Sequence, residues 1–210
     1  MVINLKINEI ANLGSNVKTM IKNENCSVLM MSDATGEGIM TVYRVMPGGM
    51  ICFSDMHMEK CDSEFELRKD KKVLCIDHCR EGRIEMEVQP GVFSIMQENE
   101  LRLDNRENQK GTTYYPLRHY HGVSVFMDVE ETQKALDTMF HGFSVNIAEL
   151  RTRYCTQDKP YVIRNDEGLS RIISSFYQRN IERPEVSAAK EYYQIKVVEM
   201  LLYLEAMTVE

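Results

Sequence analysis

Residues 78–128 constrain the fold most, because apolar and polar side chains alternate there in two separate runs. In residues 83–88 every second side chain is apolar, which is the period of a half-buried β-strand. Pro90 and Gly91 follow directly and are typical of a turn. This pattern predicts antiparallel strands that fold back on one another.

The second run places two histidines on one face of a strand. His119 and His121 share the parity of the two valines that follow them. Because alternate side chains of a strand point to the same side, the imidazoles and the valines face one way. If Val123 and Val125 face a barrel interior, the imidazoles face it too. We therefore expect a pocket that contains both histidines.

Short β-type runs fill the chain from Cys26 onward, with Gly and Pro between them. The strongest hairpin candidate joins GIMTVYRVM to MICFSDMH through a turn at Pro47, Gly48 and Gly49. About eight to ten strands at this short spacing favour a sandwich or barrel over a parallel α/β sheet. Before them, residues 16–23 are expected to form a short helix, because the start of the chain mixes helix formers with Asn and Gly.

The pattern changes to helical spacing near Val129. Helices are expected over residues 129–140, 145–154, 166–180 and 185–207. The last one is apolar on more than one face, so it needs a partner, which a second copy of the chain or a segment not present here would supply. The expected fold class is α+β, with an antiparallel β-barrel over residues 1–128 and a C-terminal helical segment for homodimerisation over residues 129–210.

Charge and hydropathy exclude several classes of function. The 32 acidic residues exceed the 25 basic ones and give a net charge of −7, which disfavours direct binding to DNA. No stretch reaches the roughly 18 apolar residues that would cross a membrane. The N-terminus lacks the apolar core of a signal peptide, so a cytoplasmic protein with reduced thiols is expected. The six cysteines include no CxxC pair, and several lie in apolar runs as small core residues do.

Four segments together resemble one family of regulators. They are HMEKCDSEFE at residues 57–66, HCREGRIE at 78–85, RHYHGVSVFMD at 118–128 and YYQIKVVEMLLYLEAM at 192–207. In combination they are similar to the N-terminal effector-binding and dimerisation domain of AraC/XylS-type transcription regulators. The resemblance implies a cupin-like β-barrel that binds a small-molecule effector, helices that dimerise, and no enzymatic activity or cofactor.

The family also implies a DNA-binding domain with two helix-turn-helix units after the helices. No such segment follows Glu210, so the chain is expected to lack this C-terminal domain. Contact with DNA is expected only through that absent domain. The acidic charge balance agrees with this expectation, because basic recognition helices would lie in the absent part.

An effector pocket needs polar side chains with a defined orientation. His119 and His121 are the first candidates, because two imidazoles on one strand face lie close enough to contact one ligand. Tyr43 is expected to offer an inward hydroxyl, and Arg80 a guanidinium for a carboxylate or phosphate. His57, at the end of an apolar strand, completes the expected ligand-binding set. Histidines that form only internal hydrogen bonds, and a tyrosine of the core, are the alternatives.

Other classes of function use some of the same residues. The ligands of a small cupin-type metalloenzyme would be His57, Glu59, His119 and His121. The fuller cupin metal motif is not present around them, so the leading expectation includes no metal. A thiol redox sensor that uses Cys75 and Cys79 is a third alternative.

Overall fold

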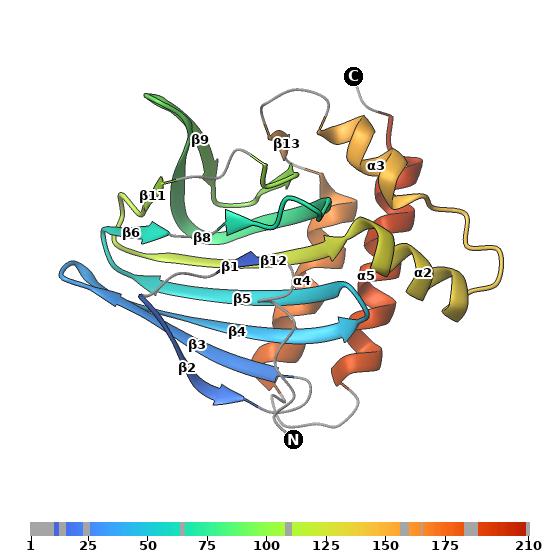
Figure 1. The fold of residues 1–210 in the computed structure, drawn as a ribbon, viewed down its shortest axis with the longest axis horizontal. Helices are drawn as coiled ribbons and strands as arrows, with labels where there is room; N and C mark the ends of the chain where they lie inside the picture. Colours follow the sequence, from blue (N-terminus) through green and yellow to red (C-terminus); the bar gives the residue numbers. More distant parts are fainter. Residues whose placement is uncertain are drawn as a thin grey trace.

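The computed structural model describes residues 11–12, 16–22, 26–63, 66–107, 111–155, 160–164, 166–182 and 189–208. Its strands are β1 (Ala11–Asn12), β2 (Val17–Lys22), β3 (Cys26–Asp33), β4 (Gly36–Met46), β5 (Gly49–His57), β6 (Lys60–Ser63), β7 (Glu66–Leu67), β8 (Val73–Gln89), β9 (Val92–Gln97), β10 (Glu100–Asp104), β11 (Gly111–Tyr114), β12 (Tyr120–Asp128) and β13 (Tyr161–Arg164). Its helices are α2 (Val129–Met139), α3 (Ile147–Tyr154), α4 (Glu167–Glu182) and α5 (Ala189–Ala206). Strands β1 to β12 precede the helices along the chain, and β13 lies between α3 and α4 (Figure 1), which confirms the expected α+β class.

Eleven of the described strands form one antiparallel sheet around the long strand β8. Its main path runs β13-β10-β8-β12-β5-β4-β3-β2, and β6, β9 and β11 pair off this path. The first part of β8 pairs with β10 and β12, whereas its last part pairs with β9 and β11. Because β8 has different neighbours at its two ends, the sheet bends along it and curls on itself (Figure 1).

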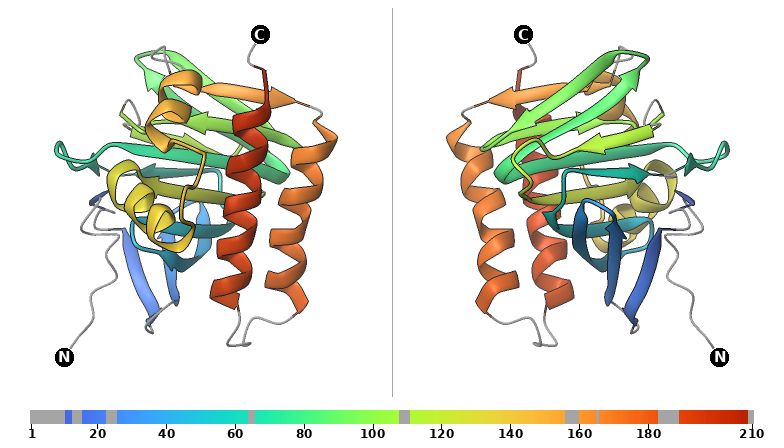
Figure 2. Two further views of the ribbon diagram at one scale, coloured as in Figure 1. Left: turned by 90° about the vertical axis from the view of Figure 1, so that its right-hand side faces the viewer. Right: turned by 90° about the vertical axis from the view of Figure 1, so that its left-hand side faces the viewer.

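Helices α4 and α5 run side by side across one face of the curled sheet (Figure 2). Their apolar side chains pack there against Phe53, Val123 and Val125. The ring of Tyr193 in α5 lies 5.9 Å from that of Phe53 and stacks on that of Phe176 in α4 at 6.1 Å. Burial of an apolar side chain of this size stabilises a fold by roughly 1.5 to 3 kcal/mol. The largest core therefore lies between the sheet and the helices.

The opposite face of the sheet lies inside the curl. A second apolar cluster there joins side chains from strands that are far apart in the sheet and from adjoining loops: Met31, Met56, Met58, Cys61, Cys79, Ile84, Met86, Met96, Tyr115 and Tyr120. Such distant strands share one cluster only if the sheet closes around it. Methionine suits this irregular interior, because its flexible thioether fills gaps of varied shape.

A buried ion cluster also lies inside the curl. Asp77, 2% exposed, accepts hydrogen bonds from Nη2 of Arg102 at 2.8 Å and of Arg106 at 2.6 Å. The Ser124 hydroxyl donates to the same carboxylate at 2.7 Å. Burial alone would raise the pKa of the Asp77 carboxyl, but Arg106 and Arg102 together hold this pKa well below its ordinary value. Asp77 is therefore ionised and balances the buried charge of Arg102 and, together with Asp104, that of Arg106.

Most of the predicted elements are confirmed. Strands β4 and β5 form the predicted hairpin, and the turn at Pro90 and Gly91 joins β8 to β9. The four predicted helices correspond to α2, α3, α4 and α5. The part of the last prediction that covers residues 185–188 lies outside the described residues.

Two elements differ from the prediction. Residues 17–22 form strand β2, so the helix expected over residues 16–23 is wrong. Pairing with β3 at the edge of the sheet outweighs the weak helical preference of these residues. Strand β13 interrupts the segment expected to be helical throughout, and its four residues pair with β10.

The valines of β12 face a different layer from the one expected. Val123 and Val125 pack against the helices, whereas Tyr120 points into the curl. His121 shares the valine face, because no register shift separates it from Val123 in the pairing with β5. The expected placement of this imidazole inside a barrel is therefore wrong. It lies on the face of the sheet that carries the helices.

Candidate functional site

Three of the five histidines gather at one end of the paired strands β5 and β12. His57 is the last residue of β5, His119 directly precedes β12, and His121 is the second residue of β12. Each offers a ring nitrogen, and these three atoms all lie within 4.8 Å of one another. The ring centroids are 4.5 Å apart for His119 and His121, and 5.2 Å apart for His57 and His119. The three histidines selected from the sequence are thus neighbours.

The pairing of β5 with β12 explains why these side chains meet. The two strands are antiparallel, and His121 lies opposite Asp55. His57 follows Asp55 by two residues along β5 and so points to the same face. His119 precedes His121 by two residues in the segment that leads into β12. Strand register, and not proximity along the chain, therefore builds the cluster.

Strand β8 completes the cluster through a β-bulge and a glycine. In its pairing with β12 the register shifts after His121, which leaves Arg80 as the extra residue of the bulge. Gly82 has φ of +88°, and a Cβ there would lie 2.1 Å from the carbonyl oxygen of His119. Only glycine lets β8 come this close. This approach brings the side chain of Glu81 to the histidines.

Two carboxylates contact the three imidazoles. Asp55 Oδ1 lies 2.5 Å from Nε2 of His121 and 2.8 Å from Nε2 of His57. Glu81 Oε2 lies 3.4 Å from Nε2 of His119 and 3.6 Å from Nδ1 of His121. Both ring nitrogens of His121 therefore face a carboxylate oxygen, which holds this imidazole in one orientation.

Glu59, the acidic residue of the metal-site alternative, lies apart from this cluster. Its carboxylate is 3.1 Å from Nη1 of Arg118. Strand β5 ends at His57, so the alternation that would place Glu59 on the same face stops before it. The acidic partners are Asp55 and Glu81, which sequence analysis missed because they depend on strand register.

A crevice of about 430 Å³ adjoins the histidines, between the sheet and α4. Its polar wall includes Asp55, Arg80, Glu81 and His121, and its apolar wall includes Phe53 and Tyr177. A crevice of this volume can hold a small organic molecule. Two of the expected ligand-binding residues, Arg80 and His121, line it.

Arg80 connects the two sides of this crevice. Its Cζ lies 5.1 Å from the ring centroid of Tyr177 in α4, a cation–π contact worth about 0.5 to 1 kcal/mol at an exposed site. Its Nε lies 3.3 Å from Oε1 of Glu81. The guanidinium is thus held along the crevice wall by one contact from the helix and one from the sheet.

The other expected ligand-binding residues do not line the crevice. His57 and His119 belong to the adjoining histidine cluster. Tyr43 packs under α5, with its ring 5.4 Å from that of Tyr193. Burial raises the pKa of its hydroxyl, as expected for a tyrosine in a core.

His78 and Tyr177 form a further link between the sheet and α4 that sequence analysis missed. The Tyr177 hydroxyl lies 3.0 Å from Nδ1 of His78. Burial and the charge of Arg80 lower the pKa of His78 to about 4, so its imidazole is neutral at pH 7. Burial raises the pKa of Tyr177, so its hydroxyl keeps its proton. No local pattern reveals a pair that is 99 residues apart.

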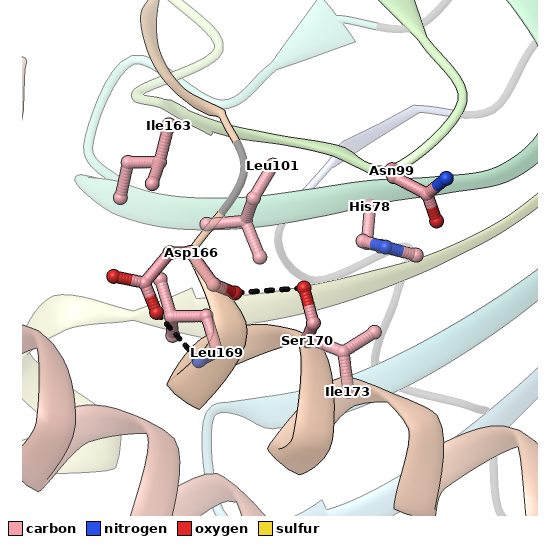
Figure 3. Close-up of a pocket in the computed structure, with 8 residues that line it drawn as sticks. All are labelled: His78, Asn99, Leu101, Ile163, Asp166, Leu169, Ser170 and Ile173. Atoms are coloured by element: carbon pink, nitrogen blue, oxygen red, sulfur yellow. Dashed lines mark hydrogen bonds between the residues drawn. The ribbon is translucent and has the colours of Figure 1, made fainter.

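A second hollow lies where β10 faces the start of α4 (Figure 3). Its volume is about 10 Å³, roughly the space of one water molecule. Asp166 caps α4 there, because its Oδ1 accepts a hydrogen bond from the Leu169 N–H at 2.8 Å. The Ser170 hydroxyl donates to the carbonyl oxygen of Asp166 at 2.7 Å (Figure 3). These residues fix the start of the helix, and the hollow is too small for an organic ligand.

The thiols of the redox-sensor alternative are buried. Cys75 and Cys79 are free cysteines with no exposed surface. Burial raises the pKa of Cys79 to about 12 and also raises that of Cys75. Because the thiolate is the reactive form, the burial of both thiols argues against a redox role for them.

No family model matches this chain, and no curated protein matches it. Among solved structures, the AraC-like transcriptional activator CuxR is similar over 93% of this chain and 64% of its own, with 13% identity and a TM-score of 0.46. ToxT from Vibrio cholerae O395 is similar over 78% of this chain and 56% of its own, with 9% identity and a TM-score of 0.36. A Cupin 2 conserved barrel domain protein from Salinispora arenicola CNS-205 is similar over 67% of this chain and 98% of its own, with 11% identity and a TM-score of 0.35.

AraC-like activators and a cupin barrel are thus among the solved structures to which this chain is similar. They are the protein classes that the resemblance in the sequence implied. The chain spans 64% of the length of one of these activators and 56% of the other. Within the described residues, no helix combines the length and the apolar character needed to cross a membrane.

Proposed function

We propose that this chain is the effector-binding and dimerising part of an AraC-type transcription regulator, with the effector bound in the crevice between the sheet and α4. The observation that carries this proposal is that both layers contribute to the crevice. Arg80 and His121 come from the sheet, and Tyr177 comes from α4. A molecule bound there contacts both layers, so its affinity depends on how α4 lies on the sheet.

An aromatic cluster connects the crevice to the second helix. Phe53 lines the crevice, and its ring lies 6.0 Å from that of Tyr177 and 5.9 Å from that of Tyr193 in α5. Phe176 of α4 stacks on Tyr193. A shift of Tyr177 on effector binding would pass to α5 through this packing. A coupling free energy of about 1 to 3 kcal/mol would suffice for regulation.

The crevice walls indicate the chemistry of the effector. Asp55 and Glu81 offer oxygens that accept hydrogen bonds, and Arg80 offers N–H groups that donate them. Phe53 and Tyr177 offer ring faces. A small neutral or cationic molecule with several hydroxyl or amino groups matches this set, whereas a dianion would be repelled by the two carboxylates.

We assign the dimer contact to the outer face of α5. Tyr193, Val197 and Met200 bury the inner face of this helix. On the outer side Ile195 and Leu202 are 62% and 44% exposed. Residues seven apart lie on the same side of a helix, so these two begin an apolar stripe that a second copy would cover.

Transcriptional control then requires a DNA-binding domain outside this chain. The net charge of −7 argues against direct contact with DNA by these residues. In this proposal the protein acts in the cytoplasm and catalyses no reaction. Effector occupancy changes the arrangement of α4 and α5, and these helices pass the change to the DNA-binding domain.

Thermal-shift measurements on metal-free protein test the effector site. A panel of sugars, polyols and amines should include a compound that raises the Tm. At 100 times its Kd, such a ligand stabilises the fold by about 2.7 kcal/mol, which corresponds to about 5 to 10 °C for a chain of this size. Arg80→Met should reduce the shift, and so should Thr41→Phe, which fills the crevice that Thr41 also lines.

Tyr43→Phe is the matched control, because this tyrosine lies outside the crevice lining. It should keep the full shift. A compound whose stabilisation survives both Arg80→Met and Thr41→Phe binds elsewhere and would contradict the proposed site. A panel without any stabilising compound would count against the proposed effector class.

A small cupin-type metalloenzyme is the second candidate function, and the convergence of His57, His119 and His121 is the observation in its favour. The two functions differ in the fate of the bound compound. A sensor returns it unchanged after incubation with protein and a divalent metal ion, whereas an enzyme converts it. Mass spectrometry of the stabilising compound distinguishes the two, and conversion that stops in His121→Ala would favour the enzyme.

A further inference from the structure

We propose that His57, His119 and His121 form a binding site for a divalent transition-metal ion, with Asp55 as the fourth ligand. The site lies at the end of β5 and β12, on the face of the sheet that carries the helices. It differs from the ligand set expected from the sequence, because Asp55 takes the place of Glu59. The proposal goes beyond the effector function: His121 and Asp55 also line the crevice, but binding of a metal ion is tested without an effector.

The spacing of the donor atoms suits one ion. Zinc binds imidazole nitrogen at about 2.0 to 2.1 Å in a tetrahedral site, so two such nitrogens lie about 3.3 Å apart. The three ring nitrogens here lie within 4.8 Å of one another. Rotation about side-chain bonds can close this difference, because the His57 side chain is 58% exposed and the His121 side chain 32% exposed.

The charges around the histidines favour a cation. Histidine binds metal as the neutral imidazole, so the three rings bring no charge. Asp55 and Glu81 bring two negative charges, which a divalent ion would neutralise. Arg80 offsets part of the Glu81 charge through Nε at 3.3 Å, but no cation lies within ion-pair distance of Asp55 among the described residues other than the histidines themselves.

The carboxylates also orient the imidazoles for binding. A metal-bound imidazole usually donates its second N–H to a carboxylate, which fixes its tautomer. Glu81 Oε2 lies 3.6 Å from Nδ1 of His121, which leaves Nε2 for the ion on the side of Asp55. Imidazole with carboxylate suits Zn²⁺, Co²⁺, Ni²⁺ or Cu²⁺, whereas Mg²⁺ and Ca²⁺ prefer oxygen ligands alone.

Zinc titration of tag-free protein, stripped with EDTA and then dialysed, tests the site. Competition with a chromophoric chelator should show one Zn²⁺ per chain, and Co²⁺ should give the visible absorption bands of a tetrahedral ion. Loss of a residue that hydrogen-bonds to a metal ligand, without binding the metal itself, lowers metal affinity about 10- to 100-fold. His57→Ala removes a ligand, so its Zn²⁺ affinity should fall by at least about 100-fold.

His57→Ala is the most informative variant, because an exposed side chain can be removed without disturbing the core. His141→Ala is the matched control, since His141 is exposed and lies outside the cluster. It should bind Zn²⁺ as the wild type does. Circular dichroism checks that each variant is folded.

Two results would overturn the proposal. One is a wild-type chain that binds no Zn²⁺. The other is Zn²⁺ binding that survives in both His57→Ala and the His119→Ala/His121→Ala double variant. Either failure leaves the effector site untouched, because the thermal-shift test uses metal-free protein. Conversely, absence of an effector does not alter the zinc titration.

Discussion

His121 of β12 faces Asp55 of β5 across an antiparallel strand pair, and its Nε2 lies 2.5 Å from the carboxylate Oδ1. The same carboxylate contacts Nε2 of His57 at 2.8 Å. Asp55 also lines the crevice beside α4. One acidic residue thus belongs to both the histidine cluster and the candidate effector site. Because its carboxylate contacts two of the three imidazoles, a change of its charge tests the cluster.

Asp55→Asn should lower the Zn²⁺ affinity by at least about 100-fold, because it keeps the side-chain size but removes the charged oxygen proposed as the fourth ligand. Competition titration with a chromophoric chelator measures the effect. Glu59→Gln is the matched control, since Glu59 is close in sequence but pairs with Arg118. An equal loss of affinity in both variants would indicate a general charge effect and would contradict a direct role for Asp55.

Gly82→Ala should destabilise the fold by at least about 1 to 3 kcal/mol and also weaken Zn²⁺ binding. Its Cβ would meet the His119 carbonyl oxygen at 2.1 Å and would push β8 away from the histidines. Gly91→Ala is the control, because Gly91 also has positive φ but no atom lies within 4 Å of the position that the new methyl group would take. Urea unfolding should therefore show a larger loss for Gly82→Ala. Similar losses would mean that backbone strain alone accounts for the effect.

Asp77→Asn should lower the free energy of unfolding by about 3 to 5 kcal/mol, because it leaves the buried charges of Arg102 and Arg106 without their shared partner. Urea unfolding at pH 7 measures this. Asp70→Asn removes a carboxylate that is also paired with an arginine, Arg68, but at the surface. It should leave the unfolding midpoint nearly unchanged. A small effect of Asp77→Asn would mean that water reaches the ion cluster.

The buried imidazole of His78 should make the fold less stable in mild acid. Its pKa is about 4 in the folded chain, below the ordinary value of 6.5, so the unfolded chain binds the proton more tightly. The stability contributed by the neutral imidazole is complete above pH 6.5 and is lost as the pH falls toward 4. At pH 5 the loss should be on the order of 2 kcal/mol.

Urea unfolding at pH 7.5 and pH 5 compares the wild type with His78→Gln. The variant should lose about 2 kcal/mol less between the two pH values. His141→Gln, which changes an exposed histidine, should lose as much as the wild type. Equal losses in all three proteins would show that the pH dependence arises from other groups.

The local sequence pattern correctly predicted those helices and strands whose formation depends mainly on local interactions. The turn at Pro47 and Gly48 between apolar runs predicted the β4–β5 hairpin, and helical spacing after Val129 predicted the positions of α2 to α5. It failed for residues 17–22, because an edge strand is stabilised by its neighbour rather than by its own composition. Alternation alone also did not reveal which face of the sheet the helices cover.

The candidate site was predicted only in part for the same reason. Alternation brought His119 and His121 to one face, and the position of His57 at a strand end made it a third candidate. Asp55 and Glu81 meet them through pairing across strands, and Asp55 is 66 residues from His121 in the chain. Such partners depend on register and on the bulge in β8, which a single sequence does not reveal.

Replacement of the two exposed apolar residues of α5 should convert a dimer into a monomer. In Ile195→Glu/Leu202→Glu, each new carboxylate is solvated in the single chain but would be buried without a partner in a dimer contact on this face. Light scattering at micromolar concentration should give about twice the 24.4 kDa chain mass for the wild type and the chain mass itself for the variant.

Met139→Glu is the matched control for this change, because it places the same charge on another exposed apolar residue, on α2. It should keep the mass of the dimer, since the proposed contact involves α5 alone. A double variant that still dimerises would move the contact away from this face of α5. A wild-type chain that is monomeric at micromolar concentration would contradict the dimer, and the stripe of Ile195 and Leu202 would then be an ordinary apolar part of the surface.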